Sequence, residues 1–385
     1  MNTKTTVIGG GLAGLTAATL LARGGRDVTL YEKSSLGGRA ATHSEHGALF
    51  NQGPHALYRG GRAMQVLREL GIEPNGKVPT PGNLFAWNGE QLHGLPTGPV
   101  TLLSSSLLTL GEKLEFARLL ARVKSLKPPG TVGEWLARDV HHENTANLVR
   151  ATLRVSTYCN DDALPATLAL DQLRLALAKN VMYLHGGWQQ LVDALKAKAL
   201  DAGVRIVEHQ RKTTLDGETV LAVTPPAARE LGVPIKPLKP VRAACLDLAL
   251  KRLPKPRAGF ALGIDAPLYF SVHSNTAELG PHHVIQVAKY LGPGDVGADA
   301  LPELEALTDA MQPGWREQVV ARRFLPELTV VHAMPGQRPP VDAHPGVWLC
   351  GDWVGEEGML SDCAFASAAE VARRILAAKS HRAAA

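Results

Sequence analysis

The sequence predicts an α/β fold built around a doubly wound parallel sheet, and three stretches of the chain carry this prediction. Near the N-terminus, TTVIG has the β-branched character of a buried strand, and LAGLTAATLLARGG after it has helical spacing and ends in two glycines. RDVTLYE then predicts a second strand. Close to the C-terminus, GVWLCGD predicts a further strand before an alanine-rich helix. Strands that alternate with helices are typical of parallel sheets.

Length and composition limit the classes of protein to which the chain can belong. At 385 residues the chain is too long for one ordinary core and predicts two intertwined domains. Hydrophobic residues make up 45% and charged residues 20%, which is typical of a soluble globular protein. The formal charge of +5 is mild and no run of Lys or Arg is present, so we expect no nucleic-acid partner.

Cysteine spacing and hydropathy predict the setting of the protein. The four cysteines are far apart in the sequence and form no C-x-x-C motif, so we expect neither a disulfide framework nor a metal site. No run of about 18 apolar residues predicts a membrane span. Three glycines interrupt the apolar N-terminal stretch, which argues against a signal peptide. We therefore expect a cytoplasmic protein.

The first glycine turn predicts a nucleotide-binding site. Gly9, Gly11 and Gly14 match the pattern G-x-G-x-x-G, whose glycines let the backbone turn tightly and approach a pyrophosphate. The helix that follows, from Leu12 and Ala13 onward, offers unpaired N–H groups at its N-terminus. Glu32 ends the second strand, where a carboxylate accepts hydrogen bonds from ribose hydroxyls. This much predicts a dinucleotide, either NAD or FAD.

The stretch KSSLGGRA distinguishes the two cofactors. Gly38 gives room beside the phosphate site, and Arg39 offers a forked set of donors for the pyrophosphate. A glycine pair and an arginine after the ribose acid resemble the FAD-binding start of the amine oxidase and phytoene desaturase superfamily of flavoproteins. The predicted cofactor is FAD.

The C-terminal stretch GVWLCGDWVGEEGMLSDCAFASAAE carries the same resemblance independently. In the family, the Asp of the G-D loop bonds the ribityl chain and phosphate, a role that falls on Asp352. The following helix would point its N-terminus at the flavin, where its dipole stabilises negative charge. We expect this helix to begin near Ser361 and Asp362, with Asp362 as its N-cap.

The resemblance implies a Rossmann-like FAD-binding domain with an inserted α+β substrate domain. The FAD-binding domain would comprise residues 1–65, 183–240 and 335–385. The substrate domain would comprise 66–182 and 241–334. Periodicity predicts a mostly helical first insertion, and strands with a helix at LPELEALTDAMQ in the second.

The resemblance also implies the residues that line the site. The segment NQGPH would lie beside the flavin ring, and Lys212 would stand where the family usually has valine next to the adenine. The residues predicted to bind FAD are Gly9, Gly11, Leu12, Ala13, Gly14, Glu32, Lys33, Gly38, Arg39, Gln52, Gly53, Pro54, His55, Lys212, Gly351, Asp352, Met359 and Leu360. Predicted substrate-pocket residues are Tyr58, Tyr269 and Trp353.

One lysine is a candidate catalytic residue. Many amine oxidases hold a lysine on a substrate-domain strand, bonded to a water near the flavin. If QVAKYL is a strand, Lys289 shares a face with Val287, which places it among apolar neighbours. The alternative is an exposed strand lysine with no role at the site.

The resemblance implies an FAD-dependent oxidoreductase that abstracts hydride from a substrate carbon and passes the electrons to O2 or a quinone. The mostly apolar first insertion favours desaturation of a lipophilic, polyene-like small molecule. Three alternatives stay open: an amine oxidase using O2, a redox-neutral flavin isomerase and a non-catalytic lipid carrier. The amphipathic, partly basic segment SSSLLTLGEKLEFARLLARVKSL also suggests peripheral contact with a membrane.

Overall fold

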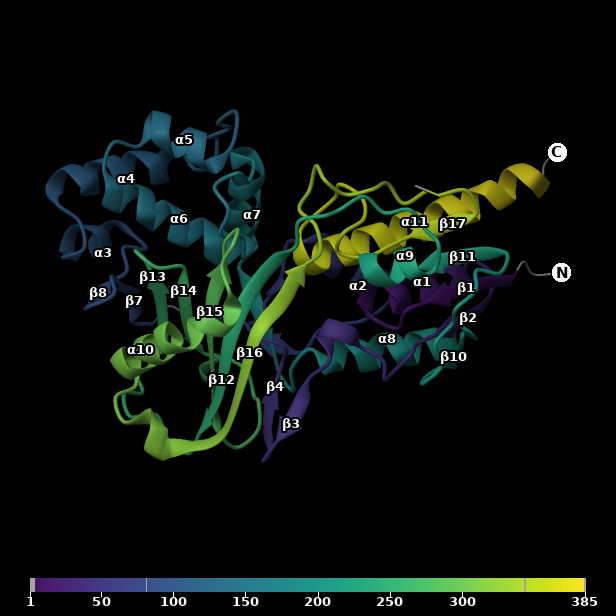
Figure 1. Cartoon of the computed structure of the whole chain (residues 1–385), viewed down its shortest axis with the longest axis horizontal. Coiled ribbons are helices and arrows are strands. Elements are labelled where there is room, and N and C mark those ends of the chain that lie inside the picture. The colour runs from purple at the N-terminus through teal and green to yellow at the C-terminus, as the bar shows by residue number, and fades with distance from the viewer. Residues whose placement is uncertain (1–3, 81, 343, 384–385) are drawn as a thin grey trace.

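The computed structural model describes residues 4–80, 82–342 and 344–383. Figure 1 shows an elongated molecule with one sheet and its helices at each end. The N-terminal strand β1 (Lys4–Ile8) and the C-terminal helix α11 (Leu360–Ala383) lie together at one of these ends. Segments distant in sequence therefore build this half of the molecule jointly.

The first sheet has five strands, and every neighbouring pair in it is parallel. In spatial order the strands are β10 (Arg205–Val207), β2 (Asp27–Tyr31), β1, β11 (Glu218–Leu221) and β17 (Val347–Leu349). The helices of this half are α1 (Leu12–Arg23), α2 (Arg62–Glu69), α8 (Gln189–Asp201), α9 (Pro225–Glu230) and α11. The predicted α/β fold with a parallel sheet is confirmed.

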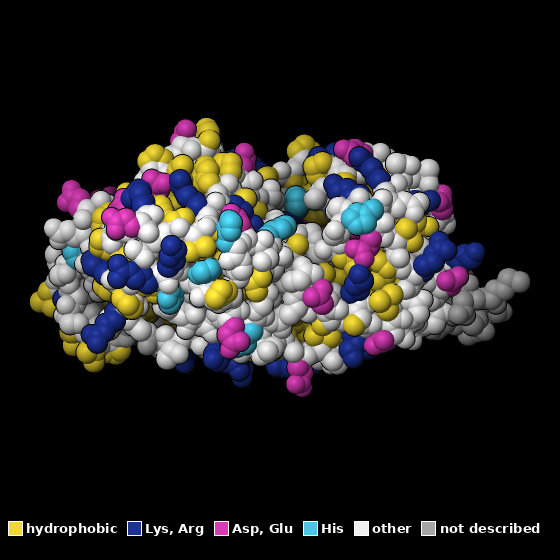
Figure 2. Space-filling view, turned by 90° about the horizontal axis from the view of Figure 1, so that it is seen from below, with side chains coloured by type: hydrophobic (Ala, Val, Ile, Leu, Met, Phe, Trp, Pro, Cys, Tyr) yellow, Lys and Arg dark blue, Asp and Glu magenta, His cyan; other side chains and the backbone are white. Residues whose placement is uncertain are grey.

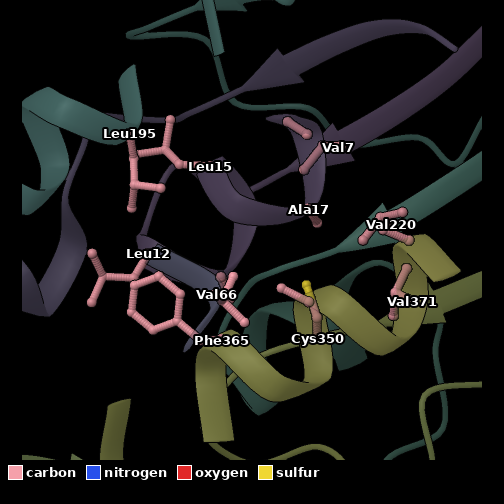
Figure 3. Packing of buried hydrophobic residues seen from close by; sticks show 14 of the residues in the cluster. Val7, Leu12, Leu15, Ala17, Val66, Leu195, Val220, Cys350, Phe365 and Val371 are labelled. Atoms are coloured by element: carbon pink, nitrogen blue, oxygen red, sulfur yellow. The ribbon is translucent and has the colours of Figure 1, made fainter. Parts of the chain in front are cut away.

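Helix α1 packs between α8 and α11, and Figure 3 shows the side chains that fill this core. Leu15 of α1 faces Leu195 of α8, while Phe365 of α11 approaches from the other side, and all three side chains are fully buried. Burial of each such side chain contributes about 1.5–3 kcal/mol. Ala17, also fully buried, has a side chain small enough for α1 to lie close to its neighbours. This packing fixes the N-terminus of α1 at the carboxyl end of β1.

The second sheet has seven strands and forms the other half of the molecule. In spatial order they are β16 (Val319–Val331), β12 (Val241–Leu250), β15 (His283–Leu291), β14 (Leu268–Val272), β13 (Phe260–Gly263), β7 (Leu84–Trp87) and β8 (Leu92–Gly94). Helix α10 (Leu301–Met311), predicted from LPELEALTDAMQ, packs against β12, β14 and β15. The remaining helices of this half are α3 (Pro99–Ser104), α4 (Leu110–Arg122), α5 (Val132–Asp139), α6 (Glu143–Thr157) and α7 (Ala166–Lys179).

The first insertion differs from its prediction in three ways. It contributes β7 and β8 to the second sheet, so residues 84–87 and 92–94 are strands within an insertion expected to be mostly helical. The helix expected over SSSLLTLGEKLEFARLLARVKSL begins only at Leu110, because Thr109 accepts the Glu112 N–H and caps α4 there, while α3 ends at Ser104, the first residue of this stretch. Helix α6 was not predicted at all.

Short strands join the two halves. These are β3 (His43–Glu45) with β4 (Ala48–Phe50), and β5 (Leu57–Tyr58) and β6 (Gly76–Lys77) on either side of β9 (Val181–Leu184). The division into two domains at the residues given above remains a prediction. No helix among the described residues is long and apolar enough to cross a membrane. On the face seen in Figure 2, acidic and basic side chains are intermixed, in keeping with the mild net charge.

Candidate functional site

A cavity of about 700 Å³ begins at the carboxyl ends of β1, β2 and β11 and extends to β12 and β16 of the second sheet. Ligands of open α/β sheets bind at these strand ends. The cavity is lined by sixteen of the residues predicted above, namely Gly9, Gly11, Leu12, Ala13, Glu32, Lys33, Gly38, Arg39, Gln52, Pro54, His55, Lys212, Gly351, Asp352, Trp353 and Leu360. The predicted site is therefore brought together in one place.

The three glycines of the first turn have different functions. Gly9 has a φ of +108°, which favours glycine. A Cβ on Gly14 would lie 1.8 Å from the Gly9 carbonyl oxygen, so Gly14 lets α1 close on the turn and does not line the cavity. A Cβ on Gly11 would meet nothing nearer than the Gly37 carbonyl oxygen at 3.9 Å. Gly11 therefore leaves open space at the start of α1.

The Glu32 carboxylate is held at the carboxyl end of β2. Its Oε2 accepts the Gly10 N–H at 2.7 Å, and its Oε1 accepts the Ser34 N–H at 2.9 Å. These bonds fix an acceptor at the cavity wall beside the glycine turn. Its remaining acceptor capacity suits ribose hydroxyls.

Arg39 and Asp352 form a two-pronged ion pair inside the cavity. Arg39 Nη2 donates to Asp352 Oδ1 at 2.7 Å, and Arg39 Nη1 donates to Oδ2 at 3.0 Å. The His332 N–H also donates to Oδ2, at 2.8 Å. Burial raises the pKa of Asp352, but Arg39 and His332 outweigh it and hold the pKa below its ordinary value. Asp352 is therefore an ionised acceptor, and Arg39 keeps a partly exposed guanidinium beside it.

The loop after β4 carries the residues expected beside the flavin. The Gly53 carbonyl accepts a hydrogen bond from Gln286 Nε2 at 2.8 Å and lies 3.0 Å from His55 Nδ1. Because a carbonyl can only accept, His55 carries its proton on Nδ1 and leaves Nε2 as an acceptor. Burial lowers the pKa of His55 to about 4, so the ring is neutral near pH 7. Its ring packs edge-on against Trp188, with 5.0 Å between the centroids.

A buried ion pair ties this loop to the second sheet and was not predicted. Arg323 Nε donates to Asp247 Oδ2 at 3.1 Å, and Arg323 Nη2 also donates to the Asn51 carbonyl. Asp247 is fully buried and lies opposite Gln286 in the strand register. A lone acid inside the apolar strand VRAACLDLALKR is the signal in the sequence that marks this pair.

Five predicted site residues besides Lys289 lie outside the cavity lining. They are Gly14, Gly53, Met359, Tyr58 and Tyr269. The Tyr58 hydroxyl donates to the Ser156 carbonyl at 2.7 Å, and the Tyr269 hydroxyl lies 3.3 Å from that of Tyr183. Both hydroxyls therefore already have hydrogen-bond partners within the protein. Tyr158, which was not predicted, lines the cavity and donates to the Pro54 carbonyl at 2.9 Å. Trp353, predicted for the substrate pocket, lines the cavity, and its Nε1–H donates to the Val223 carbonyl at 2.9 Å, just beyond the end of β11.

The predicted position of Lys289 at the flavin is wrong. Lys289 does share a face of β15 with Val287, but it lies opposite Ala244 of β12, whereas Ala243 and Cys245 line the cavity. Side chains alternate along a strand, so Lys289 faces away from the cavity. It pairs there with Glu303 of α10.

Asp362 also differs from its prediction. Helix α11 begins at Leu360, and Asp362 Oδ1 accepts the Ala63 N–H at 2.7 Å. Asp362 thus caps the start of α2 and not its own helix. Burial raises the pKa of Asp362 to about 6.

The chemistry of this cavity fits FAD. The open space at Gly11 beside the start of α1 suits a pyrophosphate, Glu32 suits a ribose, and Arg39 with Asp352 offers both a cation and an acceptor further along. The wall toward the second sheet is apolar, as an aromatic ring requires. Within the described parts of the chain, no group of three His, Cys, Asp or Glu residues is arranged to hold a metal ion.

Comparisons with known proteins agree with this fit. Residues 12–225 match the model of a family described as flavin containing amine oxidoreductase. A search of curated protein sequences gives no match. Among solved structures, an oxidoreductase from Methanosarcina mazei is 18% identical, with a TM-score of 0.73 over 96% of this chain and 99% of that one. Putrescine oxidase bound to putrescine is 15% identical, with a TM-score of 0.68 over 98% and 99% of the chains. RAB GDI from Plasmodium falciparum is 12% identical, with a TM-score of 0.64 over 96% and 98%.

Proposed function

Because the chain belongs to the flavin containing amine oxidoreductase family and is an FAD-dependent oxidoreductase, we propose that it removes hydride from a carbon of a lipophilic small molecule. Within this proposal, desaturation of a polyene-like substrate is favoured over oxidation of an amine. The observation that carries it is the wall of the cavity at the second sheet. That wall is formed by Ala56, Tyr158, Ala243, Cys245, Leu328 and Val330. It offers an ammonium group no unpaired carboxylate.

FAD, when bound, supplies the hydride acceptor. The residues of this chain position the substrate and exclude water. The apolar wall removes water from the space where a C–H bond would lie. Neutral His55 places a hydrogen-bond acceptor at the same end without adding charge. The Arg323–Asp247 pair holds the loop that carries Gln52 and His55 against the second sheet.

The electron acceptor is proposed to be a quinone or O2. The lysines that line the cavity are Lys33, which follows Glu32, and Lys212, whose Nζ lies 5.7 Å from the centroid of the Tyr31 ring, so both stand at the carboxyl end of β2. With Lys289 directed toward Glu303, the cavity lining has no lysine from the second sheet. This arrangement favours a quinone over O2.

Anaerobic mixing tests the proposed reaction. The FAD-loaded protein is mixed without oxygen with polyene precursors in detergent, and separately with alkyl and aryl amines, while the visible absorbance of oxidised flavin is followed. We expect bleaching with the polyene precursors and a product lighter by two hydrogens. Bleaching by amines alone would replace the proposal with an amine oxidase. A product of unchanged mass would indicate the isomerase, and tight lipid binding without any conversion would indicate the carrier.

We also propose that α3 and α4 contact an anionic membrane surface. Their outer side exposes Val100 (79%), Leu103 (72%), Leu110 (72%) and Leu114 (52%). Close by in sequence, the exposed cations Arg118, Arg122 and Lys124 form no ion pair within the described ranges. Apolar anchors beside unpaired cations are the features that bind helices to the surface of anionic bilayers.

Vesicle sedimentation tests this contact. We expect the protein to sediment with vesicles containing phosphatidylglycerol more than with pure phosphatidylcholine, and Leu103→Gln with Leu110→Gln to weaken binding about tenfold. Leu200→Gln, at an exposed leucine on α8 (52%), is the control and should bind as the wild type does. Equal sedimentation of all three proteins would contradict the contact.

A further inference from the structure

Helix α6 carries a buried arginine that has no partner. Arg154 is 8% exposed, and its Nη1 is completely buried without a hydrogen bond. Throughout the described ranges, no hydrogen bond or ion pair reaches its guanidinium. The other buried arginines of the described chain have partners: Arg26 pairs with Glu218, and Arg338 donates to the carbonyls of Ala333 and Gly358. Arg154 therefore stands apart from them.

An unpaired buried cation is costly to a folded protein. Transfer of a charge from water to the interior is repaid only when an opposite charge or several hydrogen bonds meet it. Here burial and then the positive charge of Arg150 lower the pKa of Arg154. Arg150 lies one helical turn away but is itself paired with Asp162, at 2.9 Å. Asp162 also raises the pKa of Arg154, but its hydrogen bonds go to Arg150, so the Arg154 guanidinium is left without an ion pair or hydrogen bond among the described residues.

Arg154 lies next to the apolar end of the cavity. Tyr158, one turn further along the chain, lines the cavity, and its ring packs edge-on against Tyr290 with 5.6 Å between the centroids. The Tyr290 hydroxyl has no hydrogen-bond partner in the part of the chain that the structure describes. Arg154 and Tyr290 thus each neighbour Tyr158, one through the helix and the other through its ring, and they stand behind the residues that line the cavity.

We propose that Arg154 binds a carboxylate carried by the substrate. Arginine pairs with carboxylates through parallel N–H donors, and the Tyr290 hydroxyl is a third donor for the same group. This inference rests on the proposed function and names the class of substrate more closely. The substrate is a lipophilic acid, whose apolar body lies along the Ala243 and Cys245 wall and whose carboxylate reaches past Tyr158 to α6.

Ligand binding to the FAD-loaded protein tests this inference without turnover. The probes are saturated linear alkyl carboxylates and alcohols of equal chain length, and the readout is the perturbation of the flavin absorbance together with calorimetric titration. We expect the wild type to bind each carboxylate more tightly than its alcohol. Arg154→Gln should weaken carboxylate binding about 10- to 100-fold and leave alcohol binding unchanged. Arg154→Lys should restore part of the preference.

Arg150→Gln is the matched control. It removes a cation from the same helix, and this cation already has a carboxylate partner, Asp162. It should keep the preference for carboxylates. Thermal unfolding gives an independent readout. Because Arg154 has no hydrogen-bonded partner to lose, Arg154→Gln should keep or raise the Tm of the protein without carboxylate. Carboxylates should raise the Tm of the wild type and of Arg150→Gln, but not that of Arg154→Gln. A fall in Tm with unchanged carboxylate binding would assign Arg154 a structural role and overturn the inference.

Two further outcomes separate this inference from the proposed function. If alcohols and carboxylates bind equally well to the wild type, the inference is wrong while the lipophilic cavity stands. If neither series perturbs the flavin, the proposed lipophilic substrate fails as well. Acetate and inorganic phosphate are tested beside the long-chain acids. If these small anions raise the Tm as much as the long-chain acids do, and if this rise depends on Arg154, the site binds free anions. That result would overturn the assignment of Arg154 to a substrate carboxylate.

Discussion

Gly11→Val is expected to give a folded protein with almost no FAD. Gly11 has an extended backbone, with φ of −80° and ψ of −174°, which valine adopts readily. The added Cβ would meet only the Gly37 carbonyl oxygen, at 3.9 Å, so the protein itself has room for it. The side chain would instead occupy the space beside the start of α1 where the pyrophosphate is expected. We predict FAD binding at least about 10- to 100-fold weaker, measured as flavin per protein after gel filtration.

Two other glycine variants serve as controls for Gly11→Val. Gly94→Val places the same side chain in open space on β8, in the other half of the molecule, and should retain wild-type flavin content. Gly14→Val should fail to fold normally, because its Cβ would lie 1.8 Å from the Gly9 carbonyl oxygen. If the Gly11→Val protein purifies with full flavin content, the cofactor does not occupy this end of the cavity.

The second large effect is expected from Arg39→Ala. The substitution leaves the buried Asp352 carboxylate with only His332 beside it and removes the cation predicted to face the pyrophosphate. Breaking a fully buried pair costs about 3–5 kcal/mol, but Arg39 is 37% exposed, so solvent screening reduces the loss in unfolding free energy to about 1–3 kcal/mol. Flavin retention should fall with it.

A double variant separates stability from cofactor binding. Arg39→Ala combined with Asp352→Asn removes the unpaired charge, so we expect its unfolding free energy to recover toward that of the wild type while its flavin content stays low. Full flavin content in either variant would show that Arg39 has no part in holding the cofactor.

The pH dependence of the unfolding free energy also has a defined sign. The pKa of Asp352 in the folded protein is depressed, so the stabilisation by its carboxylate is present above the ordinary carboxyl pKa of about 3.9. This stabilisation is lost as the pH falls through the folded pKa.

The parts of the site that depend on local spacing were predictable. The glycine turn, Glu32 and Arg39 lie within one short stretch of chain, and their side chains converge because a strand, a turn and a helix leave little freedom. Asp352 belongs to a second local motif of the same kind. These residues line one cavity as expected.

The parts that depend on packing between distant segments were not predictable. Strand alternation indicated that Lys289 and Val287 share a face, but not that α10 would cover that face. Helix α6 was missed because ENTANLVRATLRVST mixes β-branched and polar residues, which weakens its helical signal. Tyr158 and Arg154 were missed with it. The partners of Asp247 are settled by strand register, which sequence periodicity does not give.

The visible spectrum of the purified protein, before and after anaerobic dithionite and then on admission of air, tests whether the chain is an FAD-dependent oxidoreductase. We expect a yellow protein with the absorption of oxidised FAD, which bleaches on reduction and recovers in air. Slow recovery would agree with the quinone proposed above, and fast recovery would point to O2. A colourless protein that takes up no added FAD would contradict the assignment as an FAD-dependent oxidoreductase and favour the lipid carrier.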